Sequence, residues 1–507
     1  MAHAWAALGG DGALLERVSC SLRPDLLPAR LPVLELGRAT VAVCSLAAAE
    51  LSSLWSEGSP SGTAATSGTS GTSATSATSA TSPAAGASRV PSVRLDDGAV
   101  ATAFTSERHL RTDGRSPVNF APLSRFWRTA DGWLRTHANY PHHRARLLSS
   151  LGIPQQDRDE QTLAEAVAAE LAQRQAAEVE ETVHAAGGLA VAARAAQEWA
   201  VHPQGAEAAR RPLLSTARLD QAPPLPLTEA SRSRPLQSVR VLDLTRVIAG
   251  PVATRALALF GADVLRIDSP QLPERLDAHA DTGLGKRSTL LDLSTRAGQA
   301  TFEELLSAAD IVITGYRPGA LDRFGLAPES LADRRPGVVV GQLSAWGPYG
   351  PWRRRRGFDS LVQTASGIAL AERQIERRSE RREDAGGEAP GVLPAQALDH
   401  GTGYLLAAAV LRALTEQRRG RCGSRLVRLS LAQTANWLLG GLSSQRESAS
   451  APAALDGVPH DPAPWLTETD SSMGRLRYAL PPVGYDGAPA DWSRPPGVPG
   501  SDPAVWW

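Results

Sequence analysis

The sequence predicts an α/β protein in which a Rossmann-like, doubly wound parallel sheet forms a large domain beside a smaller α+β domain. Two observations lead to this prediction. Between residues 238 and 344, short apolar runs rich in β-branched side chains alternate with stretches of helical periodicity, which is typical of parallel β-α-β units. Upstream, residues 116–217 combine a hairpin pattern with alanine- and glutamate-rich helical patterns, which indicates a small α+β domain.

The first β-α-β unit is expected at residues 238–270. Apolar runs at 239–244 and 262–267 are spaced for one crossover helix. Pro251 fits the first helical position of that helix, because the N–H group that proline lacks has no partner there. The unit therefore consists of a strand, a tight turn, a helix and a second strand.

The turn of this unit is a candidate ligand site. Val247 and Ile248 belong to a loop at the N-terminus of the helix, where backbone N–H groups can face a phosphate-bearing ligand. The loop lacks a G-x-G-x-x-G pattern, and Asp268 alone does not supply a dinucleotide fingerprint. A plain NAD site is therefore disfavoured.

The remaining elements follow from the same patterns. In the large domain, strands are expected at 288–293, 310–314, 338–344 and 425–429, and helices at 297–308, at 401–416 and through Leu438. In the small domain, a hairpin turn at Asp131-Gly132 precedes helical patterns at 161–186 and 189–201. From Pro462 onwards, extended segments are expected to wrap the surface.

Changes in composition suggest domain boundaries. A Ser/Thr/Ala/Gly tract at 59–88 has too little apolar surface to offset chain entropy, so a disordered insertion is expected there, and a second polar insertion at 372–390. The predicted order is a truncated large-domain end at 1–115, a small α+β domain at 116–217, a linker at 218–237, a large domain at 238–445 and a Pro/Gly/Trp-rich tail at 446–507.

Composition also excludes several classes of function. The 53 basic residues balance the 53 acidic ones, so no net charge attracts nucleic acid or an anionic membrane. Three scattered cysteines do not form a disulfide framework or a zinc cluster, and no apolar run reaches the roughly 18 residues of a membrane span. We therefore expect a soluble cytoplasmic protein without a metal site.

Several motifs in the second half of the chain occur together in one enzyme family. The run VRVLDLTRVIAGPVATRALALFGADVLRID at 239–268 is followed by GKRSTLLDL, ADIVITGYRPGALDRFGL and SAWGPYGPWRRRRGFDSLVQTASG. Over roughly residues 238–440 these motifs resemble the class III CoA-transferases of the CaiB/BaiF type. The resemblance implies coenzyme A as a substrate, no permanently bound cofactor, and acyl-CoA and carboxylic acids as partners.

The order of the domains departs from the family pattern. The DGW hairpin and AAQEWAVHPQG at 195–205 resemble the later small domain of the family, but they lie upstream. An internal repeat supports a reversed order, because residues 36–58 and 93–104 resemble residues 400–423 and 427–438. We interpret the chain as two truncated family copies fused head to tail. The alternative is a chance match between two alanine-rich helices.

In this family the nucleophile is an aspartate that opens a helix late in the large domain. The segment LPAQALDHGTGYL matches that place, so the resemblance implies that Asp399 attacks the donor thioester and then carries CoA as an aspartyl-CoA thioester. Helix-terminal N–H groups are expected to keep Asp399 ionised, and the backbone of Gly401 and Gly403 to form an oxyanion site. The alternative is an aspartate that only caps the helix.

The resemblance also implies contacts to coenzyme A. Val247 and Ile248 correspond to positions along the pantetheine or adenine path. Leu291 corresponds to a position at the adenine, and Arg323 to one that meets a phosphate, for which the planar guanidinium is suited. These four residues are the first candidates for binding the substrate.

Other basic residues are further candidates for binding the CoA phosphates. Lys286 and Arg287 lie in a G-K-R-S turn that recurs in the family, with a solvated turn as the alternative role. Arg356 ends a run of four arginines and is the best placed of them for a CoA phosphate. Serines stand where family members often have cations, and Arg266, Arg287 or Arg317 is expected to compensate.

Two other functions stay open. An α-methylacyl-CoA racemase, a family relative, needs two acid/base groups, and its G-H-D motif is replaced here by Gly357-Phe358-Asp359, whose phenylalanine cannot carry a proton. A CoA-binding protein without turnover is the second alternative, because the chain resembles a fusion of truncated copies. Because the family works as interlocked dimers, a homodimer is one expectation, and neither nucleic acid nor a membrane is an expected partner.

Overall fold

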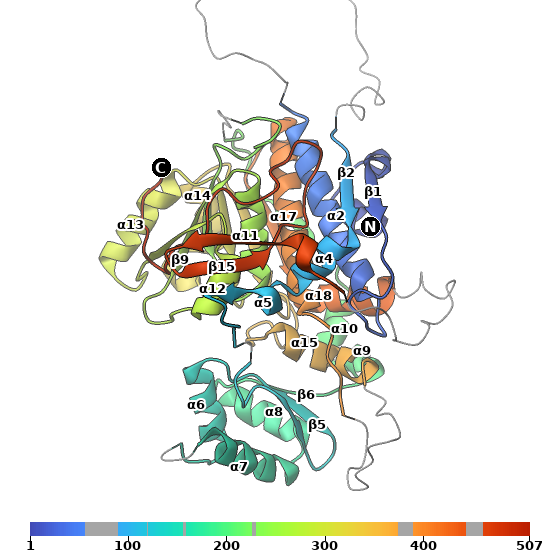
Figure 1. Ribbon diagram of the computed structural model, residues 1–507. Helices are drawn as coiled ribbons and strands as arrows, with labels where there is room; N and C mark the ends of the chain where they lie inside the picture. Colours follow the sequence, from blue (N-terminus) through green and yellow to red (C-terminus); the bar gives the residue numbers. More distant parts are fainter. Residues whose placement is uncertain (56–89, 119, 156–158, 226–229, 374–388, 443–459) are drawn as a thin grey trace, which may run out of the picture.

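The computed structural model describes residues 1–55, 90–118, 120–155, 159–225, 230–373, 389–442 and 460–507 (Figure 1). The Ser/Thr-rich tract at 59–88 and most of the second polar insertion at 372–390 lie outside these ranges. Within the described residues, no helix combines the length and the apolar character needed to cross a lipid bilayer.

A seven-stranded sheet is the centre of the large domain. The strand order is β10-β9-β8-β11-β12-β13-β7, and every neighbouring pair is parallel except β13 with β7. The strands are β7 Ser215–Arg218, β8 Arg240–Leu244, β9 Asp263–Asp268, β10 Arg287–Leu290, β11 Ile311–Thr314, β12 Val339–Ser344 and β13 Arg425–Ser430. This arrangement confirms the predicted doubly wound α/β fold. The antiparallel edge strand β7 includes the start of the segment predicted as a linker.

Helices cover both faces of this sheet. Since successive strand residues point to opposite faces, each strand contributes side chains to both layers. Val241 of β8 packs into the cluster formed with α11 (Ala249–Leu259) and α17 (Ala397–Arg418), whereas Leu242 packs into the cluster on the side of α13 (Arg296–Ser307) and α14 (Pro328–Arg334). Figure 1 shows these two layers on either side of the strands. After β13 the chain enters α18 (Leu431–Asn436) and a π turn.

One helix boundary differs from the prediction. Helix α11 begins at Ala249, so Pro251 is its third residue rather than its first. Proline is tolerated throughout the first helical turn, because none of the N–H groups there has a partner within the helix. The residue type therefore indicated the correct turn of the helix but not the position within it.

The N-terminal segment packs against the large domain. It contains α1 Ala2–Ala7, a 3₁₀ turn at Gly12–Arg17, β1 Val18–Ser21, α2 Val33–Ser52, β2 Val93–Asp96, α4 Asp97–Phe104 and α5 Ser106–His109. Helix α2 lies beside α17 (Figure 1), and the buried Glu50 of α2 forms ion pairs with Arg412 of α17 and with Arg419, which follows that helix. The segment is therefore joined to the helix that carries Asp399.

The small domain has a three-stranded antiparallel sheet, β4 Phe126–Arg128, β5 Trp133–Thr136 and β6 Ala190–Ala192. Its helices are α6 Pro141–Ser150, α7 Glu160–Ala172 and α8 Ala176–Ala185, whereas α9 Ala196–Val201 and α10 Pro203–Ala209 pack on the core of the large domain. The predicted hairpin at Asp131 is confirmed, and its carboxylate accepts a hydrogen bond from the Ala176 N–H at the start of α8. This contact lies at the break between α7 and α8, where one continuous helical pattern was predicted.

Strand β6 occupies part of a segment predicted as helical. A three-residue apolar run in alanine-rich sequence has no periodicity of its own, so its secondary structure depends on the neighbouring strand. Residues 190–192 pair with β5 because the hairpin leaves that edge open. The prediction of one helix over 189–201 was therefore wrong for its first part.

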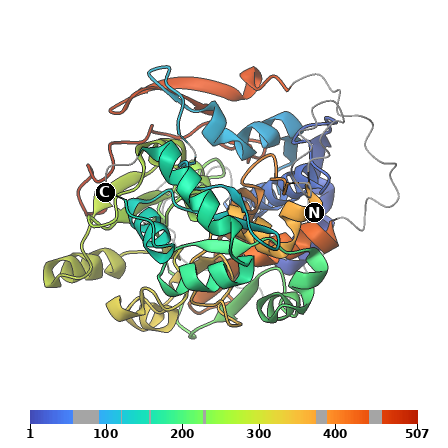
Figure 2. The same ribbon diagram turned by 90° about the horizontal axis from the view of Figure 1, so that it is seen from below.

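The C-terminal tail forms a hairpin before it becomes extended. Strands β14 (Leu466–Ser471) and β15 (Gly474–Ala479) pair with each other and with β3 (Arg111–Thr112). Figure 2 shows this hairpin at the periphery, beside the N-terminal segment. Further along, the Trp492 and Trp506 indoles donate hydrogen bonds to the Arg255 and Leu305 carbonyls, which fixes the extended part on the large domain.

Candidate active site

The sheet order creates a crevice between β8 and β11. From β8 the chain proceeds through β9 to β10 at one edge, and it then returns to β11 and continues to β13 in the opposite direction. Ligands of open α/β sheets bind at such a reversal, outside the carboxyl ends of the strands. The two loops that border the crevice follow β8 at 245–248 and β11 at 315–321.

The loop after β8 is held in an uncommon conformation. Val247 has a φ of 69°, which is strained for a β-branched residue and costs about 1–3 kcal/mol. The Glu274 carboxylate accepts hydrogen bonds from the Val247 N–H (3.0 Å) and from the Tyr140 hydroxyl (2.8 Å). Because Tyr140 belongs to the small domain, Glu274 couples that domain to the loop.

Glu274 belongs to a buried network of charges. Burial opposes its ionisation, but Arg246 and Arg266 outweigh that effect and lower the pKa of Glu274 to about 2. Arg266 also makes a two-pronged contact with Asp268, at 2.7 and 3.1 Å. Asp268 and Glu274 therefore neutralise the charge of Arg266. Contrary to the expectation, this residue does not replace a missing phosphate contact.

Asp399 lies in a pocket that the Val247 loop helps to form. It is the third residue of α17 and 7 % exposed. The pocket encloses about 1120 Å³ including its open mouth, and its lining includes Asp399 together with Val247 and Ile248. The structure thus brings three of the sequence-predicted site residues together.

A second carboxylate lies beside Asp399. Asp359 is the first residue of α15 (Asp359–Ser366), and its Oδ2 accepts a hydrogen bond from the Asp399 N–H at 2.9 Å. The Gln363 amide donates to its other oxygen, and the Leu398 N–H is a further donor. The free N–H groups at the start of α17 therefore stabilise Asp359 and not Asp399. The expectation that they keep Asp399 ionised was wrong.

The pKa values of both carboxyl groups are raised. Burial raises the pKa of Asp359 to about 6, despite its hydrogen bonds. Burial, the charge of Asp359 and the charge of Glu107 raise the pKa of Asp399 well above its ordinary value. Two buried acids with like charge so close together resist simultaneous ionisation.

Glu107 is a pocket residue that the sequence did not reveal. It is carried by α5 in the N-terminal segment, and its Oε2 lies 3.7 Å from Nε2 of His400, the residue after Asp399. His400 is fully buried and stacks on Phe104. Burial opposes ionisation of Glu107, but His400 outweighs that effect and lowers the pKa of Glu107. No local motif marks this glutamate, since only the fold brings it to the pocket.

Phe358 stacks on a histidine of the small domain. The Phe358 and His137 ring centroids are 3.6 Å apart with nearly parallel planes, and both residues line the pocket. Burial lowers the pKa of His137 to about 3, so the imidazole is neutral at ordinary pH. The residue at the place of the racemase histidine thus forms an apolar contact between the domains.

Gly401 and Gly403 have packing roles. They follow the first turn of α17, where the N–H groups belong to the helical hydrogen-bond ladder, so neither can point into the pocket. A Cβ at Gly403 would lie 2.5 Å from the Ala249 carbonyl, so this glycine allows α11 to approach closely. A Cβ at Gly401 would meet Leu36 of α2. The oxyanion role expected for these glycines does not fit.

Lys286 and Arg287 are structural residues, contrary to the expectation that they contact CoA. The Lys286 ammonium is buried and donates to Asp243 (3.1 Å) and to the Pro251 carbonyl (2.9 Å), and burial lowers its pKa to about 8. The Arg287 guanidinium bonds to Asp263 through two nitrogens and also to the Val505 carbonyl. Both cations are therefore paired with carboxylates of the protein itself.

The other predicted CoA contacts lie nearer the surface. Arg323 is exposed, with its guanidinium 4.6 Å from the centroid of the Phe324 ring. Leu291 is half-buried against the cluster of side chains on the α13 face. Neither residue lines the Asp399 pocket.

Arginines from both domains gather near the β8 and β11 loops. Burial and then repulsion from Arg317 and Arg146 lower the pKa of Arg356. Arg317 follows β11, Arg356 precedes α15 and Arg146 belongs to α6. Among the described residues, no acidic group forms an ion pair with Arg317 or Arg356. This cluster suits an anion.

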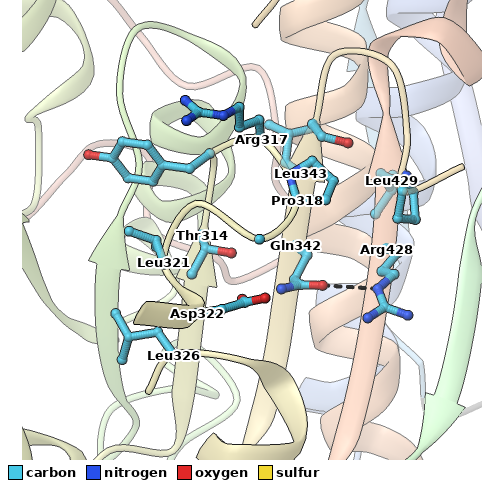
Figure 3. Close-up of a pocket in the computed structure, with 14 residues that line it drawn as sticks. Thr314, Arg317, Pro318, Leu321, Asp322, Leu326, Gln342, Leu343, Arg428 and Leu429 are labelled. Carbon is cyan, nitrogen blue, oxygen red and sulfur yellow. Dashed lines mark hydrogen bonds between the residues drawn. The ribbon is translucent and has the colours of Figure 1, made fainter. Parts of the chain in front are cut away.

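A second, polar pocket lies at the carboxyl ends of β11, β12 and β13. Figure 3 shows Asp322 pointing toward Gln342, whose amide oxygen accepts a hydrogen bond from Arg428 at 2.9 Å. The Arg317 guanidinium points away from this centre (Figure 3). The pocket encloses about 420 Å³, and of the site residues predicted from the sequence its lining includes Arg317 but not Asp399, Val247 or Ile248.

Part of the chain is similar in sequence to known proteins. Residues 236–457 match the model of CoA-transferase family III. The chain is 32% identical over 229 residues to the acetyl-coenzyme A transferase nodX of Hypoxylon pulicicidum, a match that covers 44% of this chain and 37% of that protein. The resemblance to class III CoA-transferases is thus confirmed for this part of the chain.

Other relatives extend the comparison. The chain is 31% identical over 200 residues to the probable fatty acyl-CoA transferase Rv3272 of Mycobacterium tuberculosis, covering 37% of this chain and 48% of that protein. A crystal structure of Rv3272 aligns with a TM-score of 0.38 at 27% identity, over 47% of this chain and 64% of that one. The chain spans half or less of the length of these two curated relatives.

Proposed function

We propose that this protein transfers coenzyme A from an acyl-CoA donor to a carboxylic acid, with Asp399 as the nucleophile. The observation that supports this most is the position of Asp399, which lies buried in a large pocket opposite the strained Val247 loop. The pocket opens beside the strand reversal, where an α/β sheet binds its ligand. The match of residues 236–457 to CoA-transferase family III supports the same class of reaction.

The proposed reaction proceeds through two covalent states of Asp399. The carboxylate attacks the thioester carbonyl, CoA leaves as its thiolate, and a mixed anhydride forms. The thiolate then attacks the aspartyl carbonyl, which releases the donor acid and leaves an aspartyl-CoA thioester. The acceptor carboxylate attacks that thioester, and the returning thiolate forms the new acyl-CoA and regenerates the Asp399 carboxylate.

The buried carboxylates make this reaction dependent on pH. Only ionised Asp399 is a nucleophile, and its pKa is raised by burial and by Asp359 and Glu107. The rate should therefore rise with pH, and the midpoint of that rise should lie well above the ordinary pKa of an aspartate. Asp359→Asn removes the nearest like charge, so the midpoint should shift to lower pH. The measurement is log(kcat/KM) against pH for both proteins, and an unchanged midpoint would exclude coupling of these two groups.

Arg317 and Arg356 are proposed to bind a phosphate group of CoA. Each charge-assisted hydrogen bond contributes about 1.5–3 kcal/mol, so Arg317→Ala or Arg356→Ala should raise KM for acyl-CoA by roughly 10- to 100-fold with little change in kcat. Arg353→Ala removes an exposed arginine of the same run and serves as the matched control. Steady-state kinetics at fixed ionic strength provide the measurement. Equal effects of all three changes would exclude a specific site.

The proposed function is tested with a panel of acyl-CoA donors and free acids, followed by chromatography of the CoA products. Formation of a new acyl-CoA is the expected result. Appearance of solvent deuterium at the α-carbon of a branched acyl-CoA without acyl exchange would instead support a racemase. Tight binding without either reaction would support a CoA-binding protein and contradict the transferase.

We also propose that the chain combines two truncated copies of the family. Helices α2 and α17 begin the repeated elements of the two copies, and each has an acid as its third residue, Glu35 in α2 and Asp399 in α17. In each copy a parallel strand pair ends in a strand that leads directly into a short helix, β2 into α4 and β13 into α18. Glu35 does not line the Asp399 pocket. This proposal assigns the N-terminal copy the role of a wall for the Asp399 pocket.

A further inference from the structure

We infer that the acyl group transferred at Asp399 derives from an apolar monocarboxylic acid, and not from a small dicarboxylic acid. This inference rests on the proposed function, because it names the substrate class of the same site. It is carried by the side chains around Asp399, which are apolar along the walls and mostly acidic where they are charged.

One wall of the pocket comes from the N-terminal segment after α5. Its apolar side chains are Leu110, Pro117, Val118 and Phe120. Val118 is 64 % exposed and Phe120 39 % exposed, so the mouth presents apolar surface to water. The Val118 N–H donates to Asp277 at 3.2 Å, which ties this wall to α12 (Leu276–Thr282) of the large domain. Burying such surface under a ligand is favourable by about 25 cal/mol per Å².

The facing wall is apolar as well. Ile248 from the β8 loop, Ala278 from α12 and Phe358 before α15 line this side. Phe358 is fixed by its stacking on the neutral His137. The Phe120 ring of the first wall lies 5.4 Å from the Arg135 guanidinium, measured to the ring centroid. The two walls therefore present aromatic and aliphatic surface to a chain that enters from the mouth.

The charged residues of the lining disfavour a second carboxylate on the acyl group. Six acidic side chains line the pocket: Glu107, Glu274, Asp277, Asp281, Asp359 and Asp399. Only two arginines do so, Arg108 and Arg275, and Arg108 lies 3.8 Å from Glu107. Glu274 pairs with Arg246 and Arg266, and Asp281 pairs with Arg255. Among the described residues, no ion pair involves Asp277, Asp359 or Asp399, so a succinyl or malyl group would bring its free carboxylate beside these three acids. A monocarboxylic chain avoids this repulsion, since its single carboxyl group is the one that reacts.

Binding affinities test this inference without turnover. Dissociation constants are measured by calorimetry on Asp399→Asn, which forms no covalent adduct, for CoA and for acetyl-, butyryl-, octanoyl- and succinyl-CoA. Each fully buried methylene contributes about 0.8 kcal/mol, or roughly fourfold in affinity. Octanoyl-CoA has about six more methylenes than acetyl-CoA, so burial of only two or three of them should make it bind about 30-fold more tightly. Succinyl-CoA should bind no more tightly than acetyl-CoA.

A variant locates the effect at the proposed wall. Val118→Asp should remove most of the difference between octanoyl- and acetyl-CoA and leave the affinity for free CoA within about threefold. Val201→Asp is the matched control, because Val201 is 80 % exposed on α9 and does not line the pocket. Retention of the full preference in Val118→Asp would exclude this wall as the acyl site.

The outcomes separate this inference from the proposed function. Affinities that do not depend on chain length, or tighter binding of succinyl-CoA, would overturn the inference even if CoA transfer occurs. A clear chain-length dependence without any transfer would support the inference for a CoA-binding protein and overturn the transferase. Transfer with the expected dependence would support both.

Discussion

Asp399→Asn should lower kcat/KM for CoA transfer by about 10⁴-fold or more, because the amide cannot form the mixed anhydride. The side chain keeps its shape, and the Asp399 N–H that bonds to Asp359 is unchanged. We therefore expect a folded protein with a nearly normal dissociation constant for acyl-CoA. Product formation measured by chromatography gives the rate, and calorimetry gives the affinity.

The chain contains a matched control for this substitution. Glu35 has the same place in α2 as Asp399 has in α17, but it is half-buried and lies outside the pocket. Glu35→Gln should leave kcat/KM within about twofold. Substantial activity of Asp399→Asn, or an equal loss in both variants, would contradict the assignment of the nucleophile.

Glu274→Gln should lower the free energy of unfolding by about 3–5 kcal/mol, which is typical when one partner of a buried ion pair is removed. The change leaves the positive charges of Arg246 and Arg266 without their shared carboxylate. It also weakens the contacts that hold Val247 at positive φ and Tyr140 of the small domain. Denaturant unfolding measures the loss, and Glu329→Gln, an exposed glutamate in α14, is the control.

The same glutamate makes stability depend on pH. The pKa of Glu274 is about 2 in the folded protein, where the Glu274 carboxylate is held by Arg246 and Arg266, and near 4.5 in the unfolded chain. Its contribution of about 3 kcal/mol is present above the unfolded pKa and is lost as the pH falls from roughly 5 to 2. The difference in stability between wild type and Glu274→Gln should therefore shrink across this window. A difference that stays constant would contradict the depressed pKa.

The parallel sheet could be predicted because its strands are buried on both faces. Runs such as 239–244 and 310–314 are mostly apolar, and their spacing leaves room for one helix each. The β14–β15 hairpin was not predicted, because β14 is mostly polar and only half of β15 is buried. Its stability comes from pairing with β3, a strand about 350 residues earlier in the chain.

The candidate site could be predicted only in part. Asp399, Val247 and Ile248 meet in one pocket because each belongs to a local motif at the end of a strand or the start of a helix. Lys286 was misassigned because a basic residue in a turn has no local signal that distinguishes a buried ion pair from a ligand contact. Glu107 was missed because tertiary packing alone brings it to His400.

The most direct test of the nucleophile is the intact mass of the protein after brief incubation with an acyl-CoA that it turns over. If Asp399 is the nucleophile, the protein should gain the mass of coenzyme A less one water. Peptide mapping should locate this adduct at Asp399, hydroxylamine should remove it, and Asp399→Asn should not form it. An adduct at another residue, or turnover without any covalent adduct under rapid quenching, would contradict the assignment of Asp399 as the nucleophile.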